Sequence, residues 1–173
     1  TESTMTTWPK PDAASLNAFF GNPDKDHNGV PDRAWEDANL VGMVPPYRLV
    51  LAWAPAQAVR TIRVHRKCAE SLGRVLAGIL AHYGSQEAVE RARMHLYGGA
   101  YNFRLKRGGT TLSNHSWGSA IDLDPERNGF GRKWTDSIGM MPRPVVDLFA
   151  AEGWAWGGKW STADAMHFEA VTR

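Results

Sequence analysis

The sequence contains a single cysteine, Cys68, which excludes a disulfide within the chain. Cys68 lies in a segment with helical periodicity, so we expect a buried and unreactive thiol. No apolar run approaches the roughly 20 residues of a membrane-spanning helix, and the sequence does not start with a charged segment followed by an apolar one. We therefore expect no membrane insertion and no signal peptide, and hence synthesis in the cytoplasm, or export if a leader has been removed.

An excess of charge of either sign is also missing. The formal net charge of +2 is too small to indicate a nucleic-acid partner and favours only weakly the approach to an anionic surface such as a cell wall. Internal repeats, linkers and low-complexity tracts are absent, so no separate binding module is expected. The 173 residues suit one domain over 1–173, and we expect a monomer. Residues 1–4 precede Met5, a candidate natural start, and are set aside.

Apolar residues recur at helical spacing most clearly in residues 66–83, and Gly84 is placed to end that helix. Residues 15–20 are expected to form a short helix that Ser15 caps and Gly21 ends in the left-handed conformation. We predict further helices at 86–94 and 144–152, and strands at 47–53, 60–65, 97–104, 118–124 and 166–170. Because helices and strands are mixed without regular alternation, we predict an α+β fold of short helices packed on a small, mainly antiparallel sheet.

Residues 113–122, SNHSWGSAID, combine two good metal-ligand side chains, His115 and Asp122, with a turn of small residues and the start of an apolar strand. Zinc binds imidazole nitrogen and carboxylate oxygen, and a hydrolytic zinc keeps three protein ligands with a fourth position open. The segment therefore supplies two candidate ligands of a zinc site. Asp124, on the same predicted strand face, is a candidate for orienting a ligand histidine or for capping the turn at Pro125.

A third candidate ligand, His167, lies in the segment WSTADAMHFE, three residues after Asp164. If residues 166–170 form a strand, its period of two puts His167 and Glu169 on one face. Asp164, on the loop before this strand, is a candidate general base. Spacing alone leaves a metal site and a chance scatter of these residue types equally open.

Together, Ser-x-His-x-x-Gly-x-Ala-x-Asp at 113–122 and Asp-x-Met-His-Phe-Glu at 164–169 resemble motifs of the zinc peptidases of peptidoglycan. That family contains VanY-like D-alanyl-D-alanine carboxypeptidases and L-alanyl-D-glutamate endopeptidases, including many phage endolysins. The resemblance extends from about Val44 to Glu169 and does not clearly include the extension at residues 5–43.

The resemblance implies one zinc ion per chain, bound by His115, Asp122 and His167, with Asp164 as the catalytic acid and base. Many relatives carry Glu at the position of Asp164, and Asp at this position matches the endopeptidase branch. The resemblance also implies an α+β fold like that of hedgehog proteins and D,D-peptidases, with the metal in a cleft on the sheet. The partner it implies is bacterial peptidoglycan.

The function that follows is zinc-dependent hydrolysis of a peptide bond in the stem peptide of peptidoglycan. The resemblance favours an endolysin-like L-alanyl-D-glutamate endopeptidase, which would reach the cell wall by the route that phage lysins use. A D-alanyl-D-alanine carboxypeptidase is the alternative within the family. The alternative of another class is a catalytically inactive, zinc-bearing module that binds peptidoglycan. Asp164 argues against the module, which would need no carboxylate beside its metal.

Arg104 and Arg107 lie shortly before Ser113, where a guanidinium could stabilise an oxyanion or bind a substrate carboxylate. The resemblance favours Arg104 as a second catalytic residue, and the alternative is an ordinary surface cation. The candidates for substrate binding are Arg107, Ser113, Trp117 and Trp156. Tryptophans in such a position serve equally well as core or as wall of a cleft.

Asp24, Asp26, Asn28 and Asp32 resemble the front of a calcium-binding loop. The EF-hand loop needs a bidentate glutamate at its twelfth position, where this chain has Trp35. Asp and Asn followed by Gly also form ordinary turns. We therefore expect a turn here, with Ca²⁺ as the disfavoured alternative.

Overall fold

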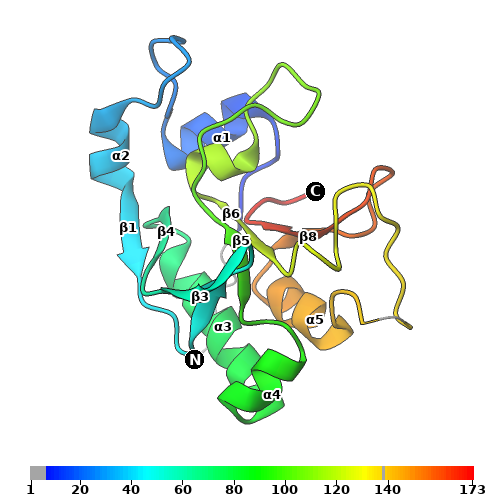
Figure 1. The fold of residues 1–173 in the computed structure, drawn as a ribbon. Coiled ribbons are helices and arrows are strands. Elements are labelled where there is room, and N and C mark those ends of the chain that lie inside the picture. Colours follow the sequence, from blue (N-terminus) through cyan, green and yellow to red (C-terminus); the bar gives the residue numbers. More distant parts are fainter. Residues whose placement is uncertain (1–6, 138) are drawn as a thin grey trace.

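The computed structural model of the protein describes residues 7–137 and 139–173, so the expectation for residues 1–4 and Met5 lies outside the described residues. The described residues form five α-helices, one 3-10 helix and eight strands (Figure 1), which confirms the predicted α+β class. None of these helices has the length and apolarity needed to cross a membrane. In chain order the elements are α1 (Ala13–Phe20), α2 (Arg33–Asn39), β1 (Leu40–Met43), β2 (Leu49–Leu51), β3 (Ala54–Val59), β4 (Ile62–His65), α3 (Ala69–Tyr83), α4 (Gln86–Arg91), β5 (Leu96–Gly99), η1 (Asn114–Trp117), β6 (Ala120–Leu123), α5 (Arg143–Ala151), β7 (Ala155–Gly157) and β8 (Asp164–Glu169).

Six of the described strands form the central sheet, in the order β3-β2-β5-β6-β8-β7. β2 and β5 are parallel, and the other neighbouring pairs are antiparallel, as predicted. β1 and β4 form a separate antiparallel pair. β6 and β8 therefore lie inside the larger sheet, where each has a hydrogen-bonded neighbour on both sides.

The two faces of β6 and β8 have different surroundings. Ile121 and Phe168 are fully buried in the hydrophobic core. The Phe168 ring stacks on Phe149 of α5, with ring centroids 3.9 Å apart. Figure 1 shows α5 and α3 together below the sheet. Because side chains alternate along a strand, Asp122 and His167 point to the opposite face.

The end of α3 agrees with the sequence prediction, whereas the start of α1 and the backbone conformation at its end differ from it. α1 begins at Ala13 because Asp12, not Ser15, caps it: the Asp12 carboxylate accepts hydrogen bonds from the Ser15 amide and hydroxyl, both at 2.8 Å. Gly21 has φ 82° and ψ 167°, so the left-handed helix ending expected there is wrong. Gly84 does end α3 in the left-handed conformation, as predicted, at φ 87° and ψ −16°.

Several strand and helix ends come earlier than predicted. β6 ends at Leu123, because the positive φ of Asp124, 47°, does not continue a strand. α4 ends at Arg91, and the positive φ of Arg93, 66°, does not continue a helix. Asp164, expected on a loop, is the first residue of β8. The sequence did not predict α2, η1, β1, β3 or β7, which are short and, in β3, largely exposed, so they lack a clear apolar period.

The stack on Phe149 makes Phe168 a test of the core that supports the sheet. Phe168→Ala should lower the free energy of unfolding by about 3–5 kcal/mol, because it removes a fully buried ring and leaves a cavity. Chemical denaturation monitored by circular dichroism measures this loss. Trp53→Ala, at a residue that is 67% exposed, is the control and should change stability by less than about 0.5 kcal/mol. Equal losses in the two variants would contradict the prediction.

Candidate active site

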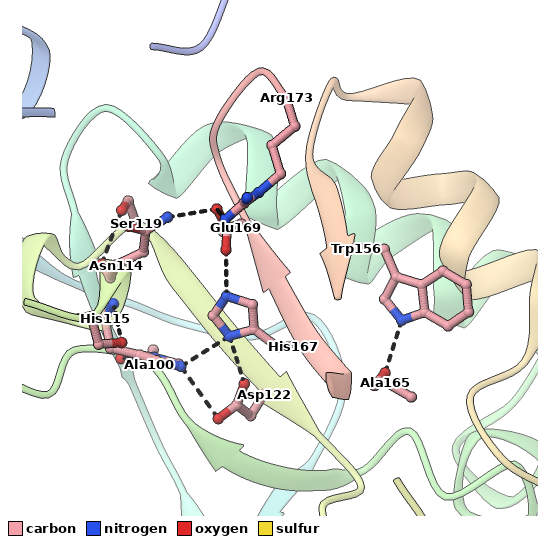
Figure 2. A network of polar contacts seen from close by, with 11 residues as sticks. Ala100, Asn114, His115, Ser119, Asp122, Trp156, Ala165, His167, Glu169 and Arg173 are labelled. Carbon is pink, nitrogen blue, oxygen red and sulfur yellow. Dashed lines mark hydrogen bonds and ion pairs between the residues drawn. The ribbon is translucent and has the colours of Figure 1, made fainter. Parts of the chain in front are cut away.

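Asp122 and His167 are brought together by the register of β6 and β8. The two residues are direct partners across this antiparallel pair, and such partners have Cβ atoms about 4.5–5.5 Å apart. His167 Nδ1 lies 3.1 Å from Asp122 Oδ1 (Figure 2). His115 Nε2 lies 3.3 Å from Asp122 Oδ2 and 3.2 Å from His167 Nδ1. The three predicted ligand side chains thus meet at one point on the sheet.

His115 reaches this point from η1, the single turn of helix before β6. The Ser113 hydroxyl caps η1 by accepting a hydrogen bond from the His115 amide at 3.3 Å. Gly118 ends η1 in the left-handed conformation, at φ 67°. A Cβ at Gly118 would lie 2.8 Å from the backbone nitrogen of His65, so only glycine fits this close approach.

Hydrogen bonds on the far side of each imidazole determine which nitrogen faces the centre. His115 Nδ1 donates to the carbonyl oxygen of Ala100 at 2.6 Å, which leaves the Nε2 lone pair directed at the other ligands. His167 Nε2 donates to Glu169 Oε1 at 2.8 Å, which leaves Nδ1 directed at the same centre. Both histidines are buried, so these tautomers are held by neighbouring protein groups rather than by water.

This donor set fits a tetrahedral divalent ion. Ligand atoms about 2.0–2.1 Å from a tetrahedral zinc ion lie about 3.3–3.4 Å from one another, close to the 3.1, 3.2 and 3.3 Å separations observed. Two nitrogen lone pairs and a carboxylate this close repel one another unless a cation lies between them. The His-Asp-His cluster could therefore hold a metal ion.

The carboxylates around His167 also attract positive charge. Burial disfavours the imidazolium form of His167, but the hydrogen bonds to Asp122 and Glu169 outweigh burial and raise its pKa to about 10. Burial alone would raise the pKa of Asp122, but the charges and hydrogen bonds of the neighbouring histidines outweigh burial, so the pKa of Asp122 is lowered. A divalent ion would compete with a proton for the same imidazole nitrogen.

Glu169 holds His167 from behind and is itself fully engaged. Its Oε2 accepts hydrogen bonds from Asn114 Nδ2 at 2.6 Å and from an Arg173 nitrogen at 3.3 Å (Figure 2). The Arg173 guanidinium also lies over the Trp160 ring, 4.4 Å from its centroid. The alternation of β8 predicted that Glu169 shares a face with His167, but the sequence did not indicate its role or that of Asn114 and Arg173.

Asp124 does not orient a ligand histidine. Its left-handed φ of 47° turns it out of the strand, and its two carboxylate oxygens accept hydrogen bonds from Arg93 at 2.9 and 3.0 Å. Its carbonyl oxygen accepts hydrogen bonds from Asn128. These contacts agree with the expectation that Asp124 caps the following turn and not with the expectation that it orients a ligand histidine.

Asp164 reaches the site through an irregularity in β8. Trp156 of β7 pairs with Phe168, but the next residue, Gly157, pairs with Asp164. Residues 165–167 are thus an insertion relative to β7. A Cβ on Gly157 would lie 2.5 Å from the Asp164 carbonyl oxygen, so this pairing requires glycine. The insertion lets Asp164 line the site, although strict alternation would turn its side chain away from the ligands.

The Asp164 carboxylate has the properties of a proton acceptor and donor. Its Oδ1 is buried and has no hydrogen-bond partner. Burial, with the nearby charge of Asp122, raises its pKa, although His167 and Arg107 act in the opposite direction. A raised pKa and a free oxygen suit a group that must accept a proton and then release it.

The ligands and Asp164 line a cavity of about 300 Å³ with a cationic rim. Arg104, Lys106 and Arg107 lie on this rim, and in the part of the chain that the structure describes none of them forms an ion pair. The Arg107 guanidinium lies 5.0 Å from the ring centroid of Phe130. Ser113 lines the same cavity. The arrangement can bind an anionic group beside the metal-binding cluster.

Trp160 is the tryptophan that lines this cavity. The two tryptophans expected to contact substrate, Trp117 and Trp156, do not line this cavity. Trp117 is 2% exposed and donates its indole N–H to Asn17 Oδ1 at 3.0 Å. Trp156 donates to the carbonyl oxygen of Ala165 at 2.9 Å. The Trp117 contact joins segments that are distant in sequence, and the Trp156 contact lies across the irregularity between β7 and β8. Local sequence patterns reveal neither contact.

The candidate calcium loop is a turn in the structure. Asp32 Oδ1 accepts a hydrogen bond from the Ala34 amide at 3.0 Å and caps α2. Asn28 Oδ1 accepts a hydrogen bond from the Val30 amide at 3.2 Å. Among the described residues, the one group of three or more His, Cys, Asp or Glu side chains close enough to share a metal ion is the His-Asp-His cluster.

The fold and the site together define a class: an α+β protein with a His-Asp-His cluster that could hold a metal ion and a carboxylate with an unpartnered oxygen in one cavity on a sheet. Residues 106–170 match a family described as D-alanyl-D-alanine carboxypeptidase. The match covers less than half of the chain but includes every residue of the cluster, and it supports the assignment to the zinc-dependent peptidoglycan peptidases. Searches of curated proteins and of solved structures found no match.

Glu169 offers a test of how His167 is held. Glu169→Gln keeps an oxygen for His167 but puts an amide NH₂ against the donors of Asn114 and Arg173, so zinc affinity should fall about 10–100-fold. Competition with a chromophoric chelator at fixed pH measures the affinity. Glu126→Gln, at a side chain that is 84% exposed, is the matched control and should bind zinc as the wild type does. If both variants bound zinc equally well, Glu169 would have no part in holding the ligand.

Proposed function

We propose that this protein is a zinc metallopeptidase that hydrolyses a peptide bond in the stem peptide of bacterial peptidoglycan, as an L-alanyl-D-glutamate endopeptidase of the endolysin type. The observation that carries the proposal is the meeting of His115, Asp122 and His167 in one cavity with the unpartnered Oδ1 of Asp164. A protein that only bound a metal would gain nothing from leaving a buried carboxylate oxygen without a partner, since this costs about 1–3 kcal/mol.

The residues of the cavity would divide the work of hydrolysis among them. A zinc ion held by His115, Asp122 and His167 would supply Lewis-acid polarisation of the scissile carbonyl and activation of the attacking water. Asp164 would accept a proton from that water at Oδ1 and pass it to the leaving amine. The raised pKa of Asp164 brings its proton affinity closer to that needed for both transfers near neutral pH.

Arg104 and Arg107 would meet the negative charges of the reaction and the substrate. Arg104 lies on the rim of the cavity, where its guanidinium could stabilise the oxyanion of the tetrahedral intermediate. Arg107 and Lys106 would attract the carboxylates of the stem peptide, because neither forms an ion pair among the described residues. Ser113 and Trp160 complete the wall against which the peptide would lie.

Two other functions remain as alternatives with distinct outcomes. The description of the matched family favours a D-alanyl-D-alanine carboxypeptidase, which would release the terminal residue of the stem. The inactive zinc-bearing module would bind peptidoglycan without cleaving it. Mass spectrometry of muropeptides after digestion identifies the bond and separates all three.

Substitution of Asp164 tests the catalytic step. Asp164→Ala should retain one zinc per chain yet lose at least about 100-fold of its activity on purified peptidoglycan, because general acid and base catalysis contributes about 10²–10⁴-fold. Release of new amino groups measures activity, and elemental analysis measures zinc. Asp147→Ala, on the exposed side of α5, is the control and should keep full activity. Wild-type activity in Asp164→Ala would remove this residue from the mechanism.

Removal of the metal tests the ligand assignment as a whole. EDTA should abolish hydrolysis, and zinc added afterwards should restore it, whereas EDTA already saturated with zinc should have no effect. Activity that persists in EDTA would exclude a metallopeptidase. Zinc binding and binding to cell-wall sacculi without release of amino groups would support the inactive module instead.

A further inference from the structure

A second cavity, of about 440 Å³, lies directly beside the first. Lys106 lines both cavities. The helix η1 separates them, since His115 lines the first and Trp117, two residues later, lines the second. Because the Lys106 side chain lines both, the two cavities meet at that residue, and a ligand in the first can continue past it into the second.

The far wall of the second cavity comes from the amino-terminal part of the chain. Residues of α1 and of the loop after it face the segment 105–112 across this space, and Figure 1 shows α1, in blue, beside the yellow-green helix η1. An isolated bridge between Leu105 and Leu112 and the hydrogen bond from the Lys106 amide to the Thr111 carbonyl, at 2.8 Å, shape the segment as a hairpin. The wall formed by α1 and the loop after it lies outside the matched residues 106–170.

The lining of the second cavity combines an apolar floor with neutral hydrogen-bonding groups. Leu16 and Leu112 contribute to the floor, and the amides of Asn17 and Asn22 and the hydroxyl of Thr110 lie around it. Apolar floors with a few placed polar groups are typical of sites for small organic ligands. Amide and hydroxyl groups both donate and accept hydrogen bonds, as sugar hydroxyls and acetamido groups do.

The two cavities differ in charge. The first has the unpaired cations Arg104, Lys106 and Arg107 on its rim, and two of its three carboxylates, Asp122 and Glu169, are paired with the buried histidines. The second is lined by two carboxylates, Asp12 and Asp24, and shares Lys106. A carboxylate-bearing peptide is therefore favoured in the first cavity and opposed by like charge in the second. In peptidoglycan the stem peptide carries the carboxylates and the N-acetyl sugars are neutral.

We propose that the second cavity binds the muramyl sugar to which the stem peptide is attached. The proposal rests on the peptidoglycan peptidase function proposed above and adds the orientation of its substrate. The neutral sugar lies against α1 and the hairpin, and the acidic peptide lies toward Arg104 and Arg107.

The proposal also selects the bond that is cleaved. The two cavities meet at Lys106, so a sugar in the second cavity places the first residues of the stem nearest to the His-Asp-His cluster. The bond after the first alanine lies among these residues. The D-alanyl-D-alanine bond lies at the far end of the stem. Sugar recognition at this position therefore implies an endopeptidase rather than a carboxypeptidase.

Two substitutions on α1 test the proposal as a matched pair. Ala13 lines the second cavity, whereas the equally exposed Ala14 does not. The substrates are N-acetylmuramyl-L-alanyl-D-glutamyl peptide and the same peptide with an acetyl group in place of the sugar. Wild type and Ala14→Trp should show a kcat/KM about ten-fold higher for the muramyl substrate, equivalent to about 1.4 kcal/mol. Ala13→Trp, which fills the cavity, should bring this ratio to about one.

The outcomes separate the sugar site from the peptidase function. Equal kcat/KM for both substrates in the wild type, or a ratio that Ala13→Trp leaves intact, overturns the sugar site while the peptidase function stands. Failure to cleave either substrate counts against the peptidase function. In that case, calorimetric titration with N-acetylmuramyl-L-alanine still tests the site, which is overturned if Ala13→Trp and Ala14→Trp bind equally. If Ala13→Trp does not fold, Thr110→Trp fills the cavity from the opposite wall.

Discussion

The register between β6 and β8 is the constraint on which the whole site depends. It sets Asp122 directly opposite His167, and a shift by one residue would turn one of these side chains into the core and the other out of reach. The register is fixed from the other face, where Ile121 and Phe168 are fully buried against the helices. The apolar residues of these strands thus determine the ligand geometry, although none of them touches the cluster.

The polar groups behind His167 are paired in a chain that leads away from the His-Asp-His cluster. His167 donates to Glu169, which accepts from Asn114 and Arg173. A buried polar group without a partner costs about 1–3 kcal/mol, so this pairing, together with the hydrogen bond from His115 to Ala100, offsets the cost of burying two imidazoles. Among the cluster residues and Asp164, the Asp164 Oδ1 is the buried side-chain atom without a hydrogen-bond partner, as the catalytic role proposed for it would require.

Different kinds of sequence signal account for different parts of the site. Period-two alternation correctly put His167 and Glu169 on one face of their strand, whereas the ligand roles of His115, Asp122 and His167 came from the resemblance. The loop expected at Asp164 is wrong, because Gly157 permits an insertion in β8 that no local pattern signals. Local patterns also do not reveal that Trp117 has its partner, Asn17, in a distant helix. Contacts between segments far apart in the sequence are decided by packing, which periodicity does not contain.

The His-Asp-His cluster and the second cavity are built from different parts of the chain. Residues 106–170, which match the family, contain the ligands, Asp164 and one wall of each cavity. The opposite wall of the second cavity belongs to α1 and the loop after it, which the match does not include. Changes in α1 can therefore alter the second cavity without disturbing the strands that hold the His-Asp-His cluster. Under the proposed function, the reaction would depend on the sheet, and the choice of substrate would depend on the segments packed beside it.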